Sequence, residues 1–256
     1  MRRLWGAVLQ RRVQRRLAGP RLLRAFAAAY PDAYFVEIGS NDGEQHDHLR
    51  PLILAHPWRG IMVEPVPYVF ERLRSNYAPL ADRVALEPAA IGARDGRAPF
   101  FHLAQAAEGE AVPGWYDGIG SFSREAVLSH SAKIPGLEER LVASDVDVLS
   151  FDSLLARHGG REPDLVVIDA EGHDHEIVGS IDLEAHRPRL LVYEHFHLSQ
   201  EDRAATRARV EEAGWETMEE GFDTWCLDPR PGDRLTAFWR ELEPGVPGSS
   251  VHDEAP

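Results

Sequence analysis

Short apolar segments alternate with amphipathic segments along most of this chain. Runs rich in β-branched and aromatic residues, bounded by turn-forming residues, predict strands at 35–38, 60–64, 84–91, 146–149, 164–169, 189–194, 215–219 and 223–227. Apolar positions at helical spacing predict helices at 44–55, 67–77, 151–158, 174–180 and 199–213. Strands that alternate with helices in this way predict an α/β fold, a largely parallel sheet with helices on both faces.

Three parts of the chain depart from this pattern. The turn-forming segment 94–97 lies between extended segments and predicts a hairpin. Residues 104–144 are interrupted by glycine and proline, so we interpret them as an insertion or substrate lid with a helical piece at 124–131. We therefore expect an N-terminal extension at 1–30, one domain at 31–242 and a disordered tail rich in Pro, Gly and Ser at 243–256.

Composition narrows the class of protein. The single cysteine, Cys226, excludes an internal disulfide framework and a four-cysteine zinc site. No apolar run approaches the roughly 18–20 residues that a membrane span needs, and the apolar patch at 4–9 is shorter than the core of a signal peptide. We therefore expect a cytoplasmic protein.

Charge is distributed unevenly along the chain. Residues 1–24 hold eight arginines and no acidic residue, so the net charge of −14 for the chain leaves −22 for the remainder. A basic helix here could touch an anionic membrane or an acidic partner, or could instead pack its apolar face on the domain or on a second subunit of a homo-oligomer. The acidic body would repel phosphates, which argues against nucleic-acid binding.

The segment 34–43 is typical of a cofactor-binding loop. A buried strand there ends in an acidic residue, and a glycine-bracketed turn leads into the next segment. The glycines are spaced G-x-x-x-G, whereas a dinucleotide fingerprint requires G-x-G-x-x-G. This spacing and the strand-terminal acid favour S-adenosylmethionine over NAD, because carboxylates suit its amino group and ribose hydroxyls. The predicted cofactor contacts are Glu37, Gly39, Asn41, Asp42 and Gly43.

Two further segments complete the predicted cofactor site. Glu64 ends the second strand, where its carboxylate could accept both ribose hydroxyls, and Pro65 follows it. The same position suits the ribose of NAD, and Glu64 could also serve only as a capping residue. Small apolar side chains at Ala90 and Ile91 could flank an adenine ring.

A second polar cluster follows two buried strands, at 168–175 and 193–197. Loops at the carboxyl ends of neighbouring parallel strands face each other across the site, so these groups should meet. One interpretation is acid–base chemistry, with Asp169 or His195 as the base and Glu171 and His197 orienting the acceptor. The other is a divalent metal held by Asp169, Glu171, Glu194 or His195. No compact zinc motif is present, so we favour acid–base chemistry without a metal.

Together these residues resemble the FkbM family of S-adenosylmethionine-dependent methyltransferases. The resemblance covers roughly residues 33–228 and rests on the segments 35–43, 62–65, 89–92, 146–155 and Ile168-Asp-Ala-Glu-Gly172. It implies a Rossmann-like class I fold with a seven-stranded sheet whose last strand is antiparallel. It also implies methyl transfer to an oxygen, often on sugars or polyketide-like small molecules. The family commonly has Val where Ala170 stands, and the segment 118–122 resembles a serine-containing loop of some members.

The sequence therefore predicts a methyltransferase that uses S-adenosylmethionine and acts on a hydroxyl of a carbohydrate or small molecule. Two other functions compete with this one. A nicotinamide-dependent oxidoreductase would share the sheet but would leave Glu37 and the missing central glycine unexplained. A non-catalytic cofactor-binding or scaffold protein would leave the carboxylate–histidine cluster without a purpose.

Overall fold

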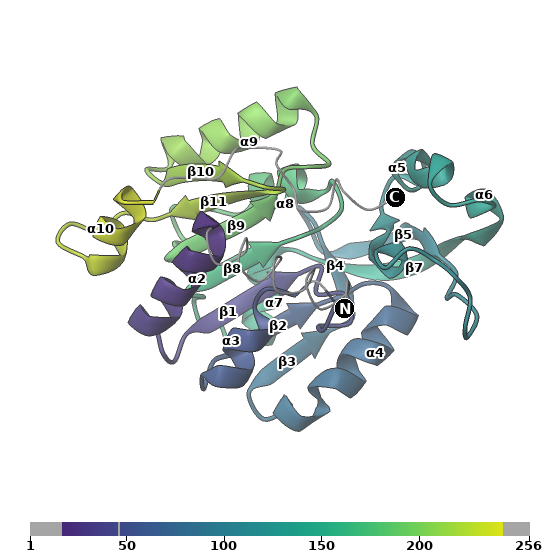
Figure 1. The fold of residues 1–256 in the computed structure, drawn as a ribbon, viewed down its shortest axis with the longest axis horizontal. Helices are drawn as coiled ribbons and strands as arrows, with labels where there is room; N and C mark the ends of the chain where they lie inside the picture. Colours follow the sequence, from purple (N-terminus) through teal and green to yellow (C-terminus); the bar gives the residue numbers. More distant parts are fainter. Residues whose placement is uncertain (1–16, 46, 243–256) are drawn as a thin grey trace, which may run out of the picture.

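The computed structural model describes residues 17–45 and 47–242. Its main sheet has seven strands in the order β10-β11-β9-β8-β1-β2-β3 (Figure 1). These strands are β1 (Tyr34–Ile38), β2 (Arg59–Val63), β3 (Val84–Glu87), β8 (Leu165–Ile168), β9 (Leu190–Glu194), β10 (Glu216–Glu220) and β11 (Asp223–Leu227). β11 pairs antiparallel with both neighbours, and the other pairs are parallel. The predicted α/β fold with an antiparallel last strand is confirmed.

Helices cover both faces of this sheet. They are α2 (Ala18–Ala29), α3 (Arg50–Ala55), α4 (Pro67–Tyr77), α7 (Phe151–Arg157), α8 (Asp174–Ser180), α9 (Gln200–Glu212) and α10 (Arg234–Arg240). Side chains of α2, α3, α4 and α10 share one apolar core, and side chains of α7, α8 and α9 share the other. Along β1, Phe35 enters the first core while Val36 and Ile38 enter the second, as a strand buried on both faces requires.

Helix α2 belongs to the body of the domain. Leu22 and Phe26 are completely buried against the sheet. At the N-terminus of the helix, the amides of Ala18 and Gly19 donate to the two carboxylate oxygens of Glu220 at 2.8 and 2.7 Å. An anionic partner at that end satisfies free N–H groups and complements the helix dipole. The predicted extension at 1–30 thus includes a packed helix, whereas residues 1–16 and the predicted tail at 243–256 lie outside the described residues.

A second, four-stranded sheet departs from the prediction. Its order is β4-β7-β5-β6, formed by β4 (Ala89–Ile91), β5 (Gly96–Leu103), β6 (Gly120–Ser121) and β7 (Leu141–Leu149). The single strand predicted at 84–91 is divided at Pro88, which lacks the amide N–H that a continuous ladder needs. The predicted hairpin around 94–97 is wrong, because β7 lies between β4 and β5.

The predicted lid has a core of its own. Between β5 and β7 lie η2 (Tyr116–Gly118), α5 (Arg124–Leu128), η3 (Ser129–Ala132) and α6 (Leu137–Arg140); the remaining short helix, η1 (Ala78–Leu80), follows α4. Leu103, Tyr116 and Leu137 are almost fully buried among the lid's apolar side chains. The lid is therefore a packed subdomain at one end of the main sheet (Figure 1). None of the described helices is both long and apolar enough to span a membrane.

Candidate active site

Four loops meet at the carboxyl ends of β2, β1, β8 and β9, which are neighbours in the sheet. The amides of Gly39 and Ser40 each donate to the carbonyl of Val63 at 3.0 Å, and the amide of Asp169 donates to the carbonyl of Ile38 at 2.9 Å. These bonds extend the sheet's ladders into the loops. The residues predicted after separate strands are therefore held next to each other.

The two glycines of the first loop have different tasks. Gly39 has a φ of +81°, and a Cβ there would lie 1.7 Å from the carbonyl oxygen of Asp169. Only glycine permits this contact, so Gly39 brings the β1 loop against the β8 loop. Gly43 has a φ of +68°, and a Cβ there would lie 2.4 Å from the ring of Tyr77. Gly43 thus allows α4 to pack against this loop, and its predicted cofactor contact stays a prediction.

Glu64 joins the end of β2 to the β1 loop. Its Oε1 accepts from the amide of Val66 at 2.8 Å, and its Oε2 accepts from the amide of Asn41 at 3.0 Å. Its side chain is 6 % exposed, and burial raises its pKa to about 7. A carboxylate has about four lone-pair sites, so two remain for a pair of hydroxyl donors. Pro65, predicted with it, is partly exposed beside this carboxylate.

Glu37 and Asp42 are both buried, but they use their carboxylates differently. Asp42 accepts from the amides of Glu44 and Gln45 at 2.9 Å each and thereby stabilises the turn. Glu37 faces the carboxyl group of Asp47, and its own Oε2 has no partner. Burial and the nearby carboxylates of Asp47 and Asp169 raise the pKa of Glu37 well above its usual range. An unpartnered buried oxygen requires a donor, and a cationic ligand would supply one.

The side chains predicted to flank an adenine belong to the second sheet. Ala90 and Ile91 belong to β4 in the second sheet and are 5 % and 1 % exposed. Ala90 packs in an apolar cluster with Val66 and Phe100, and Ile91 packs in the core beneath the main sheet. These side chains are therefore occupied by packing.

The end of β8 carries the strongest electrostatic imbalance. Asp169 follows the strand directly, and its side chain is accessible, as expected in the wall of a cleft. Burial and the nearby carboxylates of Glu171 and Asp174 raise its pKa well above its usual range. Glu194 is 12 % exposed, and its Oε2 has no partner. In the described part of the chain, no arginine or lysine forms an ion pair with Asp169, Glu171 or Glu194.

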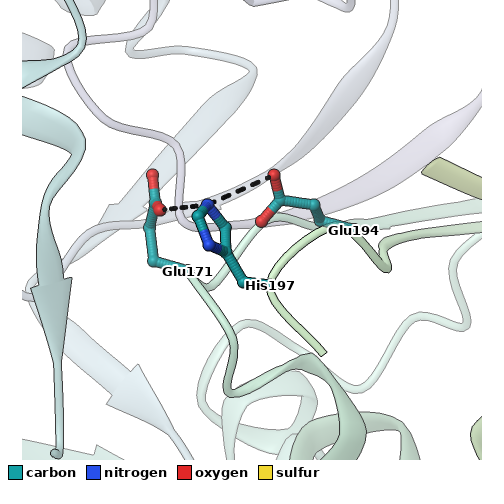
Figure 2. A group of neighbouring side chains, drawn as sticks. All are labelled: Glu171, Glu194 and His197. Carbon is teal, nitrogen blue, oxygen red and sulfur yellow. Dashed lines mark ion pairs between the residues drawn. The ribbon is translucent and has the colours of Figure 1, made fainter. Parts of the chain in front are cut away.

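His197 faces this cluster and His195 does not. The Nε2 of His197 lies 3.2 Å from Oε2 of Glu171 and 4.0 Å from Oε1 of Glu194 (Figure 2). His195 is 3 % exposed, and its Nδ1 lies 2.9 Å from the hydroxyl of Thr224 in β11. Burial lowers the pKa of His195 to about 4, so its ring is neutral. The structure thus brings three of the four predicted catalytic residues together and places His195 in the packing against β11.

Two site residues adopt a left-handed backbone. Asn41, with a φ of +47°, and Glu171, with a φ of +50°, are the two non-glycine residues with positive φ in the described chain. This conformation is unfavourable for side chains other than glycine. Such strain persists where the surroundings enforce it, and it concentrates at functional sites. Its occurrence in both loops supports their assignment to one site.

The lid is fastened over these loops. Tyr68 donates its hydroxyl to Oδ1 of Asp117 at 3.0 Å, and Arg72 pairs with Oδ2 of Asp117 at 2.8 Å. Gly118 then lies so close to the site that a Cβ there would be 3.2 Å from Oε1 of Glu171 and 3.5 Å from Nδ2 of Asn41. Sequence reasoning found the lid but not this fastening, because its partners come from α4 and a distant loop.

A cavity of about 450 Å³ lies between the lid and the β8 loop. Its walls include Ser121, Phe122 and His130 from the lid, and Glu171 and His197 from the catalytic loops. This volume is within the roughly 300–1,000 Å³ typical of small-molecule sites. His130, which sequence reasoning missed, has no signal in the local pattern of apolar residues and enters the site only through the fold of the lid.

One group of described side chains could also hold a metal. Glu171, Glu194 and His197 each offer a ligand atom, and these atoms lie within 4.8 Å of one another. Mixed carboxylate and imidazole ligands suit a divalent cation. The set differs from the predicted alternative, since His197 takes the place of His195.

Comparison with known proteins identifies a family whose profile covers the strands and loops of this site. A family profile described as the methyltransferase FkbM domain matches residues 37–222. Search of the curated proteins finds no match. Among solved structures, similarity extends to the methyltransferase FkbM from Methylobacillus flagellatus, at 14 % identity and a TM-score of 0.49. That alignment covers 77 % of this chain and 44 % of the other, so the chain spans less than half of that protein's length.

Two other solved structures match this chain at lower identity. Fibrillarin from Aeropyrum pernix with bound S-adenosyl-L-methionine matches at 10 % identity and a TM-score of 0.40, over 76 % of this chain and 66 % of that one. The ribosomal protein L11 methylase from Lactobacillus delbrueckii matches at 9 % identity and a TM-score of 0.36, over 76 % and 68 % of the two chains.

Proposed function

The chain belongs to the FkbM methyltransferase family, and from that premise we propose that it transfers a methyl group from S-adenosylmethionine to a hydroxyl oxygen of a carbohydrate or another small molecule. The observation that carries this proposal is the convergence of three groups at the carboxyl ends of neighbouring strands. Glu64 stands on the cofactor side, Asp169 lies in the middle, and the Glu171–His197 pair faces the lid cavity.

The residues on the cofactor side fit this cofactor. S-adenosylmethionine, when bound, supplies a methyl group on a positively charged sulfur. Glu64 retains acceptor capacity for two ribose hydroxyls, and the unpartnered Oε2 of Glu37 can accept from an ammonium group. The carboxylates of Asp169 and Glu194 lack basic partners, so a cationic ligand relieves their mutual repulsion. The same carboxylates hold the uncharged-sulfur product less strongly.

The residues on the lid side can activate a hydroxyl. The Glu171–His197 pair, whose Oε2 and Nε2 lie 3.2 Å apart, is placed to take the proton of an acceptor hydroxyl and to hold it between the carboxylate and the imidazole. General-base assistance of this kind contributes about 10²–10⁴-fold to a rate. The lid and the strand-end loops would hold the acceptor beside the cofactor, and positioning can contribute roughly 7–11 kcal/mol. Asp169 lies between the two sides and orients the reacting groups.

The test is transfer of radiolabelled methyl from S-adenosylmethionine to a panel of sugar and small-molecule hydroxyls. Asp169→Ala should abolish turnover and leave cofactor affinity nearly intact. Asp147→Ala, an exposed change in β7, serves as the matched control. Equal loss of cofactor binding in Asp169→Ala would reassign that residue to the cofactor site. Absence of label transfer to any acceptor, together with absence of cofactor binding, would refute the proposed function.

A further inference from the structure

The lid cavity has acidic walls and no basic wall. Among its lining residues, which are all described, Glu171 and Glu176 carry carboxylates and none is lysine or arginine. Three histidines also line it, and Nδ1 of His173 lies 3.5 Å from Oε2 of Glu176. A ligand in this cavity therefore meets two carboxylates and neither a lysine nor an arginine.

The cavity also offers many hydroxyl groups. Ser121, Ser123 and Ser129 line it beside the imidazoles, and Phe122 supplies an apolar wall that packs against His173, with ring centroids 4.8 Å apart. Hydroxyl and imidazole groups both donate and accept, so they match a ligand with several hydroxyls. Polar groups around one aromatic face suit a saturated sugar ring.

A row of contacting aromatic and imidazole rings passes through the cavity wall, and each end of the row is exposed at the protein surface. Trp115 contacts His130 at 5.7 Å, His130 contacts His197 at 5.9 Å, and His197 contacts Phe196 at 5.0 Å between ring centroids. Phe196 continues to Phe222 at 4.3 Å. Trp115 and Phe196 are 38 % and 53 % exposed, and they are two of the three exposed large apolar side chains in the described chain. Exposed aromatic residues that cluster at the mouth of a cavity indicate a ligand-binding surface.

We propose that the acceptor is a glycoside that is uncharged or bears an amine. Its sugar ring occupies the lid cavity with one hydroxyl at His197, and its aglycone lies outside the cavity on Phe196 and Phe222, at one end of the aromatic row. Acceptors with a phosphate or carboxylate on the sugar are excluded by the carboxylates of Glu171 and Glu176, because like charges in contact oppose binding. This inference rests on the proposed function and specifies the acceptor of that site.

Matched glycosides test the predicted charge selectivity. The protein saturated with S-adenosylhomocysteine is titrated with 4-nitrophenyl glycosides of glucose, galactose and mannose, each as the neutral sugar, the 2-amino sugar and the uronic acid. A neutral or amino form should bind at least tenfold more tightly than the uronic acid of the same configuration. Equal or tighter binding of the uronic acid would overturn the proposal, and so would a failure of all nine compounds to bind. Binding of the nucleoside ligand itself is measured first, so failure of the proposed function is recognised separately.

Two variants, each with a control, test the acidic wall of the cavity and the row of aromatic rings. Glu176→Lys should reduce the preference against the uronic acid, whereas Glu184→Lys, which precedes β9 at the opposite edge of the sheet, should not change it. Phe196→Ala should weaken a nitrophenyl glycoside by about three- to tenfold and leave the methyl glycoside unchanged. Leu54→Ala in α3, the third exposed apolar side chain, is the control and should alter neither. An equal effect of Phe196→Ala on both glycosides, or no effect, would refute the placement of the aglycone.

Discussion

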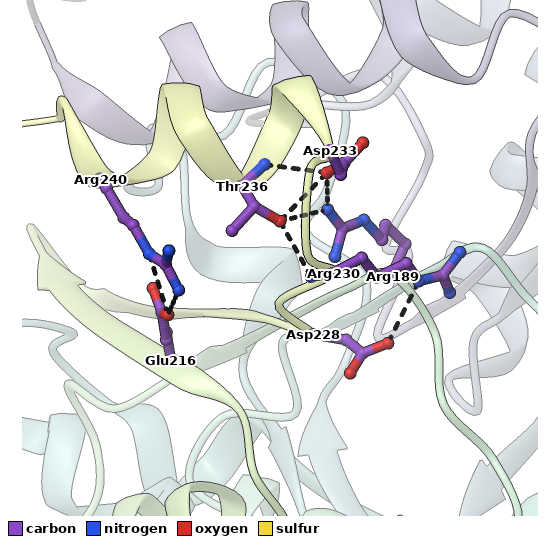
Figure 3. Close-up of polar contacts among 7 residues, drawn as sticks. All are labelled: Arg189, Glu216, Asp228, Arg230, Asp233, Thr236 and Arg240. Carbon is purple, nitrogen blue, oxygen red and sulfur yellow. Dashed lines mark hydrogen bonds and ion pairs between the residues drawn. The ribbon is translucent and has the colours of Figure 1, made fainter.

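Strand β9 has an ionisable residue at each end, and the two residues differ in how their charges are compensated. Arg189 directly precedes the strand and is 1 % exposed, yet its guanidinium pairs with Asp233 and donates to the hydroxyl of Thr236 at 2.8 Å (Figure 3). Glu194 ends the strand with an unpartnered oxygen among other carboxylates. The charge at the Arg189 end of β9 is thus compensated by an anion, whereas the carboxyl group at the Glu194 end lies among other carboxyl groups.

The two ends of β9 therefore differ in their contribution: the Arg189 end stabilises the fold, and the Glu194 end has the features of a functional site. At the Arg189 end, Asp233 also caps α10 by accepting from the amide of Thr236 at 2.9 Å, so the network fastens α10 to the core. At the Glu194 end, burial and the carboxylate of Asp169 raise the pKa of Glu194 above its usual range. A strongly perturbed group in a cleft is typical of a functional site, because a stable fold alone would avoid it.

The largest expected effect is on catalysis at the Glu194 end. His197→Ala should lower kcat by about 10²–10⁴-fold, because the general base is removed, while cofactor affinity stays nearly constant. Steady-state kinetics and calorimetry measure the two quantities. His175→Gln in α8 is a matched control, since His175 contacts Thr206 and lies outside the lid cavity, and it should retain turnover. Unchanged kcat in His197→Ala would remove the base from the mechanism.

The next effect is on stability at the Arg189 end. Asp233→Ala should lower the free energy of unfolding by about 3–5 kcal/mol, because it leaves the buried guanidinium of Arg189 without its anion. Urea denaturation measures this change. Arg240→Ala removes the exposed pair with Glu216 in the same region (Figure 3) and should produce no measurable change. Similar values for the two variants would show that Arg189 needs no counter-charge.

Replacement of Glu194 should change the free energy of unfolding in the opposite direction. Glu194→Gln should stabilise the protein, although it lowers activity. Because the folded-state pKa of Glu194 is raised, this residue costs the native protein no stability below about pH 4, where it is protonated in both states. The native protein loses stability as pH rises from there toward the folded-state pKa. The advantage of the variant should therefore grow with pH, by at most about 1.4 kcal/mol per unit. Melting temperatures at pH 5 and pH 8 test this, and a variant that is less stable at pH 8 would contradict it.

The smallest expected effect is that of metal removal. We expect turnover to be unchanged after dialysis against EDTA, because the proposed proton transfer needs only Glu171 and His197. Loss of activity that Mg²⁺ or Mn²⁺ restores would instead make Glu171, Glu194 and His197 metal ligands.

The cofactor side of the site was more predictable than the acceptor side. Glu37 lies near the end of β1, and Gly39 and Glu64 follow β1 and β2, whose apolar pattern is continuous, so local sequence places them at one edge of the sheet. The lid fastening joins Tyr68, Arg72 and Asp117 from separate elements, and no local pattern encodes that contact. Likewise, Pro88 marks where the chain changes sheets, but only the pairing of β4 with β7 shows which sheet it joins.

The two histidines after β9 show a second limit of sequence reasoning. His195 still pairs with the neighbouring hairpin, because its amide donates to the carbonyl of Phe222 at 2.8 Å. The chain then turns, with the amide of Leu198 donating to the carbonyl of His195 at 3.2 Å, and this turn carries His197 toward Glu171. The alternation of strand side chains cannot be extended through such a turn, so sequence alone did not separate the two roles.

Calorimetric titration with S-adenosylmethionine tests the central claim most directly, using the native protein and Glu64→Ala. Glu87→Ala is the matched control, because Glu87 ends the adjacent strand with the same 6 % exposure but is fully paired with Arg157 and His158. The account predicts that the native protein and Glu87→Ala bind and that Glu64→Ala, shown to be folded by circular dichroism, binds at least tenfold more weakly. Absence of binding by the native protein, or undiminished binding by Glu64→Ala, would contradict it.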